Sequence, residues 1–424
     1  MTRKEFLSTS AALAAGAALG QSGKTKTASS SGSISRGQPP PRNRHPYKGI
    51  DWSTAHQIRG TTHVHCRDQA ALDVILKRIE FLTLSNYYPS APWYPLAKMT
   101  ENYYRVHHDF PVMVNGKREA GPFDWNAIIG SWRQELTPES YKKGPFPFKE
   151  GAPLFKPLPE GVLEAPNAEH HHFFSKKGQR CGYLHMNAVG SMFASGTFDQ
   201  HSSYRTLHHG YDFGSGEFWG VAIDRMLDGL ICPDGGGVTI NHPVWSAYDR
   251  PFLLELLDYD PRVLGMEVIE GATGNGEVYW DWVLATGRQC FGFFVPDHTI
   301  REKSGAFGVN VLVTPERSVQ ACLKAYRDGN FYGAKRGLNE LRFTRISFDG
   351  LTVEAQTDRP ARLAVITACG TVKEEKNATS ISWTMQNKVG WSAPRKNAHV
   401  FARIKAYALD GSGEELFSQP YLFV

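Results

Sequence analysis

The chain has 424 residues, of which 41% are hydrophobic and 21% are charged, and its formal net charge is +5. This length exceeds what one hydrophobic core usually organises, so we expect two folded units. The small net charge comes without a long Lys or Arg block, which gives no support for nucleic-acid binding. Beyond the N-terminus no run of roughly 18 apolar residues occurs, so we expect no stable membrane insertion of the mature chain.

The N-terminal residues have the pattern of an export signal. Arg3 and Lys4 precede a soft apolar run from Ala11 to Leu19, which is too short to span a membrane. Lys4 stands where a twin-arginine signal has its second Arg, so residues 1–20 predict a periplasmic or secreted protein. Residues 21–48 are rich in Ser, Gly, Lys and Pro, and we expect them to form a disordered linker.

Short apolar runs alternate with helical patterns from residue 49 to residue 337. Six runs predict buried strands: Ile58–His65, Phe81–Ser85, Cys181–Val189, Gly237–His242, Val263–Glu270 and Cys290–Val295. Three stretches predict helices: Gln69–Ile79, Glu277–Thr286 and Glu316–Arg327. The alternation predicts an α/β barrel or a doubly wound sheet, in which functional residues gather at the C-terminal ends of the strands.

Two regions depart from this alternation. Residues from about 87 to 166 are rich in Pro, Gly and aromatic residues, and we expect an insertion that shapes a substrate pocket. Residues 338–424 contain alternating β runs separated by Asp-Gly and Gly-Ser turns, which predict a small all-β sandwich domain. The six cysteines are widely spaced and contain no C-x-x-C pair, so we expect buried free thiols.

Polar side chains follow several of the apolar runs. His63 and His65 are two apart at the end of the first run, so on a strand both imidazoles point to the same face. Similar positions hold five further residues: Glu169, His185, His242, Asp297 and His298. Imidazole and carboxylate are the ligands that zinc, iron and manganese prefer, so this pattern predicts a metal site.

The order His-x-His, carboxylate, His, His-Pro and a late Asp-His pair resembles the PHP superfamily, named for polymerase and histidinol phosphatase domains. The resemblance covers about Asp51 to Gly337 and implies a distorted (β/α)7 barrel that holds metal ions. It implies seven candidate metal ligands: His63, His65, Glu169, His185, His242, Asp297 and His298. It implies further that Glu169 bridges two metals.

The chain departs from the family pattern at two places. Asn86 and Tyr87 stand where the family commonly has Asp-His, and Asp297 is directly followed by His298 where the family usually has Asp-x-His. Asn86 or Asp68 could supply a replacement oxygen ligand, and His298 could reach the site through local distortion. We therefore expect one or two divalent ions, zinc, manganese or iron, in place of three.

Several other polar residues are candidates for substrate contacts. Asn86 and Tyr87 lie near the predicted site, and Arg205 and His209 lie in one loop, where a guanidinium could bind a phosphate oxygen. The run His170–His172 could support Glu169 from behind. Exposed loop residues are the alternative interpretation for Arg205 and for these histidines.

Together these residues predict a metal-dependent hydrolase that uses metal-activated water on a small phosphate ester. His185, Asp297 and His298 are candidates for protonating the leaving group. The same superfamily also includes hydrolases of carbamates and carboxylic esters, which are an alternative. A second alternative is a non-catalytic protein that binds a sugar or another ligand through a metal. We expect a small-molecule substrate as the partner, and no pattern indicates the oligomeric state.

Overall fold

The computed structural model describes most of the chain from residue 42 onward. The described residues are 42–66, 68–85, 93, 96–98, 112–114, 117–119, 155–170, 173, 175–177, 179, 181, 183–192, 218–270, 274–298, 308–335, 341–385 and 400–423. The predicted export signal, most of the linker and most of the aromatic-rich insertion lie outside them. No helix of the described part combines the length and the apolar character needed to cross a membrane.

One sheet of eleven strands runs from the first described strand to the last. In spatial order its main path is β14 (Phe343–Asp349), β15 (Thr352–Thr367), β17 (Phe401–Ala408), β18 (Glu415–Phe417), β13 (Phe331–Lys335), β12 (Gly308–Thr314), β1 (His56–Gly60), β2 (Phe81–Leu82) and β5 (Leu163–Glu164). Off this path, β16 (Gly370–Thr384) pairs with β15 and β19 (Tyr421–Leu422) pairs with β17. Only the β1–β2 and β2–β5 pairs are parallel among the described pairings of this sheet.

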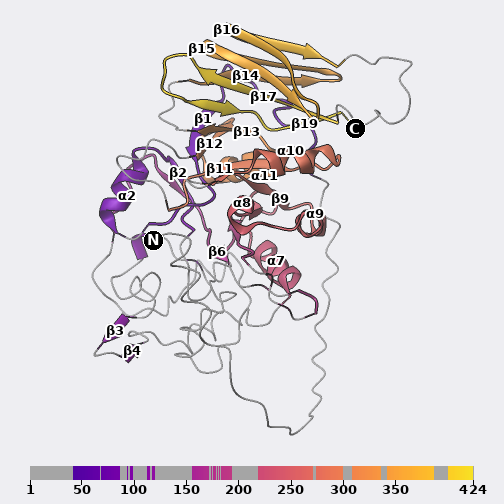
Figure 1. The fold of residues 1–424 in the computed structure, drawn as a ribbon. Helices are drawn as coiled ribbons and strands as arrows, with labels where there is room; N and C mark the ends of the chain where they lie inside the picture. The colour runs from indigo at the N-terminus through magenta and orange to yellow at the C-terminus, as the bar shows by residue number, and fades with distance from the viewer. Residues whose placement is uncertain are drawn as a thin grey trace. The chain divides into compact units, whose positions relative to one another are not determined.

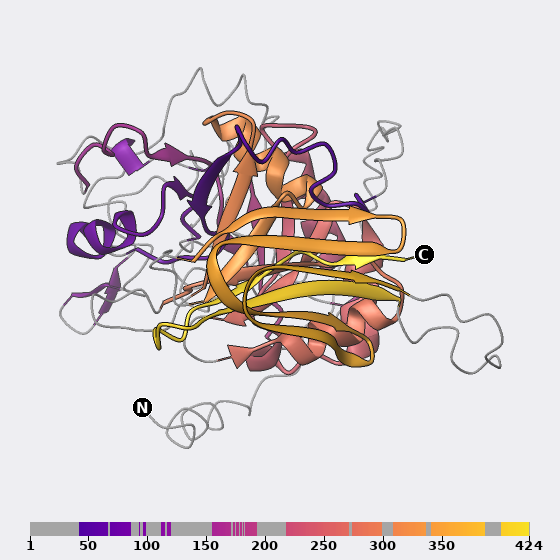
Figure 2. The ribbon, with the colours of Figure 1, turned by 90° about the horizontal axis from the view of Figure 1, so that it is seen from above.

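The C-terminal strands are continuous with the rest of this sheet. β18 pairs with β17 on one side and with β13 on the other, and the long strands β15 and β16 lie alongside each other in both views (Figure 1 and Figure 2). Pro39–Val424 forms one compact unit. The described strands after residue 338 thus belong to one sheet, and a separate β-sandwich domain there stays a prediction.

A second sheet contains six strands. Its main path is β10 (Gly274–Asn275), β9 (Val263–Glu270), β8 (Gly237–Ile240), β7 (Met186–Val189) and β6 (Glu169–His170), and β11 (Phe291–Val295) also pairs with β9. The two sheets meet at an isolated parallel bridge between Val64 and Asp297 and at a hydrogen bond of 3.0 Å from Glu169 N to Ser85 O. These contacts bring strand ends from both sheets to one place. A short hairpin, β3 (Val112–Val114) and β4 (Lys117–Glu119), forms a sheet of its own.

The described helices are short. They are α2 (Gln69–Leu76), α7 (Trp219–Asp228), α8 (Pro243–Ser246), α9 (Arg250–Tyr259), α10 (Glu277–Ala285), α11 (Val319–Asp328) and the 3-10 turn η1 (Leu96–Lys98). Asp68 caps α2, because its carboxylate accepts a hydrogen bond of 2.8 Å from Ala71 N. Ser318 caps α11 in the same way, which is why this helix begins at Val319 and not at the predicted Glu316.

The observed architecture is mixed α/β, as predicted, but it is rich in strands. All six predicted strands overlap observed ones. The first ends at Gly60 and not at His65, because the Thr61 hydroxyl accepts a hydrogen bond of 3.1 Å from His63 N and so diverts the backbone from strand pairing. A closed (β/α)7 barrel stays a prediction.

All six cysteines lie among the described residues, and none forms a disulfide. Cys66, Cys290 and Cys322 are buried, as predicted, whereas Cys369 is exposed. Burial raises the pKa of the Cys66 thiol to about 12, so this thiol is uncharged at neutral pH.

The first described residues are tied to the loops around α9. The partly buried Arg42 guanidinium donates hydrogen bonds to the backbone oxygens of Leu257, Asp260, Pro261 and Gln289. Because backbone oxygens near the end of a helix have no partner within the helix, this one side chain satisfies several acceptors at once.

Candidate metal centre

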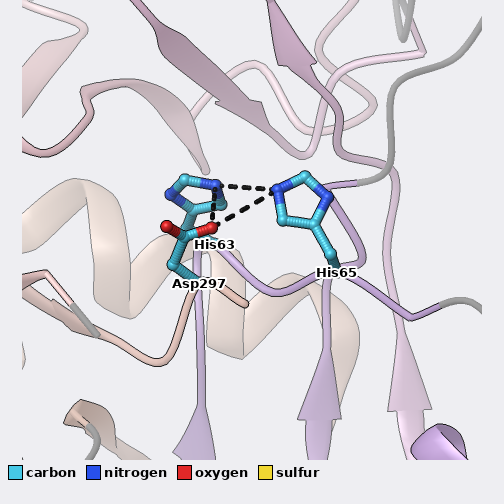
Figure 3. Close-up of side chains that lie close together, drawn as sticks. All are labelled: His63, His65 and Asp297. Carbon is cyan, nitrogen blue, oxygen red and sulfur yellow. Dashed lines mark hydrogen bonds and ion pairs between the residues drawn. The ribbon is translucent and has the colours of Figure 1, made fainter. Parts of the chain in front are cut away.

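The candidate site begins at the contact between the two sheets. His63 and His65 follow β1, and Asp297 follows β11. Asp297 N donates a hydrogen bond of 3.1 Å to His63 O, and His65 N donates one of 3.4 Å to Asp297 O. Figure 3 shows the result: the two imidazoles and the carboxylate point toward one another.

Four side-chain atoms from three segments of the chain lie close together. His63 Nε2 lies 3.1 Å from His65 Nε2, 3.3 Å from Glu169 Oε2 and 3.2 Å from Asp297 Oδ1. His65 Nε2 lies 3.0 Å from Glu169 Oε2 and 3.5 Å from Asp297 Oδ1. Ligand atoms about 2.0 to 2.2 Å from a tetrahedral ion are roughly 3.3 to 3.6 Å apart. The five separations, 3.0 to 3.5 Å, lie at or slightly below this range, so the atoms are close enough to share an ion.

The second oxygen of Glu169 faces a different pair of imidazoles. Glu169 Oε1 lies 2.8 Å from His185 Nδ1 and 3.3 Å from His242 Nε2, and it accepts a hydrogen bond of 3.2 Å from Asn241 Nδ2. The Glu169 side chain is 1% exposed. One buried carboxylate thus stands between two groups of nitrogen atoms, which is the position that a bridging ligand occupies.

Glu267 on β9 is a site residue that the sequence analysis missed. It is fully buried, and its Oε1 lies 2.7 Å from His63 Nδ1. Its Oε2 accepts a hydrogen bond of 2.7 Å from His242 N. A carboxylate acceptor keeps the proton of the His63 ring on Nδ1, which leaves the Nε2 lone pair facing the group of four atoms. The available signal was an acidic residue at an interior position of a mostly apolar strand, whose other acidic residue, Glu270, stands at its end.

His242 is oriented by the helix that follows it. Ser246 Oγ donates to Tyr183 O at 2.9 Å, so it accepts the hydrogen of His242 Nδ1 at 3.0 Å. The lone pair of His242 Nε2 then faces Glu169 Oε1, which is also an electron-pair donor. A proton on Nε2 or a metal ion would stabilise this close approach.

Two residues of the site have unusual backbone conformations. The φ angle is +28° at His242 and +49° at Asp297, and neither residue is glycine. Side chains with a Cβ are disfavoured at positive φ, so each residue stores conformational strain. Such strain is typical of functional positions, where the surrounding contacts hold the backbone in place.

The pKa values of the residues in this group are shifted in different directions. Burial lowers the pKa of His63, but the carboxylates of Glu169, Glu267 and Asp297 outweigh burial and hold the pKa well above its usual value. Burial and the neighbouring His298 and His63 lower the pKa of His65 to about 3. Burial raises the pKa of Asp297, but the nearby histidines, His63 first, outweigh it and lower this pKa. Without a metal, a proton on His63 is therefore the cation that the cluster attracts.

Three buried asparagines form hydrogen bonds to the residues of the site and to one another. Asn241 Nδ2 donates to Asn187 Oδ1 at 2.8 Å as well as to Glu169. Asn187 and Asn167 both donate to Thr62 O, directly before His63. This network links the backbone of the His63 segment to the carboxylate of Glu169, and so fixes their positions relative to each other.

Comparisons with known proteins identify no close relative. No protein-family model and no curated protein match this chain. The chain is similar to a solved two-domain protein from Bacteroides vulgatus ATCC 8482 that is described as containing a predicted PHP-like metal-dependent phosphoesterase. The identity is 14% and the TM-score is 0.37, with 86% of this chain and 94% of that chain covered. Such a distant likeness establishes neither the family nor the activity of this chain.

The structure brings together six of the predicted site residues. They are His63, His65, Glu169, His185, His242 and Asp297. His298 lies beside them, with its ring stacked on that of His65 at 4.0 Å, but its side chain is 57% exposed and its Nε2 is 3.7 Å from Asp297 Oδ1. The role of each residue as a ligand or proton donor stays a prediction.

The remaining predicted residues either have another role in the structure or lie outside the described part of the chain. Asp68 caps α2, which accounts for its carboxylate. Asn86, Tyr87, Arg205 and His209 lie outside the described residues. His170 is buried on β6 next to Glu169, whereas residues 171 and 172 also lie outside the described part.

Two overlapping residue groups are compatible with divalent metal ions. The first is His63, His65 and Asp297, and the second is His63, Glu169 and His242. In each group the ligand atoms lie within 4.8 Å of one another. A mixture of imidazole and carboxylate suits zinc, iron and manganese.

Proposed function

We propose that this chain is a metal-dependent hydrolase that cleaves a phosphate ester with one or two divalent ions. One observation carries the proposal: the Nε2 atoms of His63 and His65 lie within 3.5 Å of each other and of carboxylate oxygens of Glu169 and Asp297. Carboxylate oxygens and imidazole nitrogens that face one another repel unless a positive charge lies among them, and a divalent ion would supply that charge in place of a proton on His63.

The ion would supply Lewis acidity, which activates water near neutral pH and polarises the scissile ester bond. The residues of the chain prepare this chemistry. Glu267 holds the His63 ring by its Nδ1, and Ser246 holds the His242 ring by its Nδ1, so both Nε2 atoms face Glu169. Because these rings are fixed before substrate arrives, little reorganisation is needed during the reaction.

His298 is the candidate proton donor for the leaving group. Its imidazole is 57% exposed and stacks on the ring of His65, so it lies at the solvent side of the buried group. An exposed group beside the cluster can reach a departing alkoxide, whereas His63 and Glu267 are fully buried.

A carbamate or carboxylic ester is the second candidate substrate. In the described part of the chain, His63, His242, Glu267 and Asp297 form no ion pair with Lys or Arg. A dianionic phosphate is usually bound by such cations in addition to the metal, whereas a neutral ester needs none, so both ester classes belong in the test.

The test is metal analysis of the purified chain combined with an ester screen. The metal-free protein, reconstituted with zinc, manganese or iron, is assayed on p-nitrophenyl phosphate, bis-p-nitrophenyl phosphate, p-nitrophenyl acetate and an aryl carbamate. We expect at least one equivalent of metal and turnover that chelation removes. Less than one equivalent together with no turnover after reconstitution would contradict the enzyme, and bound metal with no turnover would favour a ligand-binding protein.

We also propose that residues 1–20 direct export. Fractionation of cells that express the full chain should place the processed protein outside the cytoplasm. Replacement of both Arg3 and Lys4 by Gln should retain the unprocessed chain in the cytoplasm, and an unchanged distribution would contradict the proposal.

A further inference from the structure

Two aromatic side chains next to the candidate metal centre are exposed. Tyr183 and Trp245 are each 49% exposed, and they are the two aromatic residues among the exposed large hydrophobic side chains of the described chain. Their ring centroids are 5.1 Å apart, with an angle of 62° between the planes. Leaving this aromatic surface in water has a free-energy cost, so a function at this place would explain it.

The pair contacts the residues of the site directly. The Trp245 ring lies 4.9 Å from the His242 ring and 5.6 Å from the His185 ring. Both histidines face Glu169 Oε1, at 3.3 Å and 2.8 Å. The exposed indole of Trp245 is therefore in direct contact with the rings of two candidate metal ligands, so one small molecule can touch both the indole and the metal centre.

The pair is also held in place by the same helix turn that orients His242. Ser246 Oγ and Tyr248 OH both donate to Tyr183 O, at 2.9 Å and 3.3 Å. Tyr248 OH in turn accepts a hydrogen bond of 3.1 Å from His185 N. The backbone that carries Tyr183 is thus fixed relative to α8, and the aromatic surface is preorganised.

We propose that Tyr183 and Trp245 form a ring-binding subsite, which receives the ring of the ester substrate while its reacting group lies at the metal centre. This inference rests on the proposed hydrolase and names its substrate class: esters whose non-reacting part is an uncharged ring. Two faces at a steep angle form a corner, in which a ring can lie flat on one face and meet the other with its edge. An aromatic ring and a sugar ring share the flat or C–H-rich face that such a corner binds.

Phosphonates that are not hydrolysed test the subsite without turnover. The metal-loaded protein is titrated with phenylphosphonate, cyclohexylphosphonate and methylphosphonate by calorimetry, and the quenching of Trp fluorescence is followed. We expect phenylphosphonate to bind about tenfold more tightly than methylphosphonate. Cyclohexylphosphonate separates the two sources: tight binding indicates a saturated ring such as a sugar, and weak binding indicates an aromatic one.

Variants assign the preference to the pair. Trp245→Ala should remove the preference for a ring, Trp245→Phe should restore most of it, and the metal content should stay unchanged in both. Val278→Ala on α10 is the matched control, because Val278 is 70% exposed on another helix and should leave every affinity unchanged.

Three outcomes would overturn the subsite: equal affinities for phenylphosphonate and methylphosphonate, no binding of either, or an equal loss of both in Trp245→Ala. The last would mean that Trp245 only positions His242. These outcomes are independent of the ester screen, because a protein that turns over esters with no preference for rings retains the proposed function and loses only this inference.

Discussion

Two clusters of charged side chains in the described part of the chain differ in how their charge is balanced. In the C-terminal region Arg403 is 2% exposed, and its guanidinium donates to Asp281 at 2.8 Å and to Glu277 at 2.9 Å. Lys405 adds contacts of 3.0 Å to Glu277 and 3.1 Å to Glu415. In this cluster each of the three partly buried carboxylates faces a buried cationic side chain.

At the candidate metal centre the carboxylates of Glu169, Glu267 and Asp297 face imidazoles. An imidazole balances a carboxylate only when it carries a proton or when both share a metal ion. The comparison teaches that burial of acidic residues alone does not identify a metal site. The identifying feature is a group of carboxylate oxygens and imidazole nitrogens that converge on one another.

The largest expected effect is the loss of Glu169 from the metal centre. Glu169→Gln should reduce hydrolysis by about a thousandfold, because the contribution of a metal to the transition state is several kcal/mol. The bound metal, measured by atomic spectroscopy, should fall below one equivalent. The matched control is Glu415→Gln in the other cluster, which should retain full metal. Equal metal content in both variants would remove the distinction between the clusters.

The reverse experiment breaks the balanced cluster. Arg403→Met should lower the free energy of unfolding by roughly 1 to 3 kcal/mol, because the partly buried Asp281 loses the guanidinium and Glu277 keeps only Lys405. Urea unfolding measures this change. Arg288→Met is the control, since the Arg288–Asp258 pair is 33% and 48% exposed and should contribute at most about 1 kcal/mol. A lowered metal content in folded Arg403→Met would show that the two clusters are not independent.

Glu267 should have a smaller effect than Glu169 because it orients His63 from behind. Glu267→Gln keeps the size of the side chain but weakens the hydrogen bond to His63 Nδ1, and we expect the metal affinity to fall about 10- to 100-fold. Competition with a chelator of known affinity measures it. An unchanged affinity would show that the His63 ring is held without this carboxylate.

Glu164 on β5 offers a third case, a carboxyl group whose partner is neither a cation nor a histidine. Burial raises its pKa to about 7, although it accepts a hydrogen bond of 2.9 Å from Leu96 N. Because the folded pKa lies above the usual value of 4.5, the folded state holds the proton more tightly, and stability is lost as pH rises from about 4.5 to 7.

Glu164→Gln removes this ionisation. The variant should therefore be more stable than the parent at pH 8, by about 1 to 2 kcal/mol after allowance for partial exposure, and close to the parent at pH 4. Thermal unfolding at the two pH values measures the difference. A gain of equal size at both values would mean that the effect does not come from the charge.

The residue types of the site could be predicted from sequence because they follow apolar runs. His63, Glu169, His242 and Asp297 each stand at or just beyond a strand, and the strand ends meet in space. Glu267 was missed because it lies inside β9, where only its register toward the cluster separates it from an ordinary strand residue. That register depends on pairing with β8 and β11, which are distant along the chain.

The architecture was predictable in its elements and less so in their connections. The range of β9 was predicted to the residue, because its apolar run is bounded by turn residues. The pairing of β18 with both β13 and β17 was not predicted, since it joins segments about 80 residues apart in one case. Contacts of this kind leave no local pattern in the sequence.

Arg42 sets a boundary for how far the chain can be shortened from its N-terminus. When only residues before Arg42 are removed, its guanidinium keeps its four backbone acceptors. When the chain is cut after Arg42, these oxygens, at the end of α9 and before β11, lose their hydrogen-bond donor. Cleavage that releases the export signal, or attachment of an affinity tag, should therefore be tolerated anywhere up to Pro41 but not beyond it.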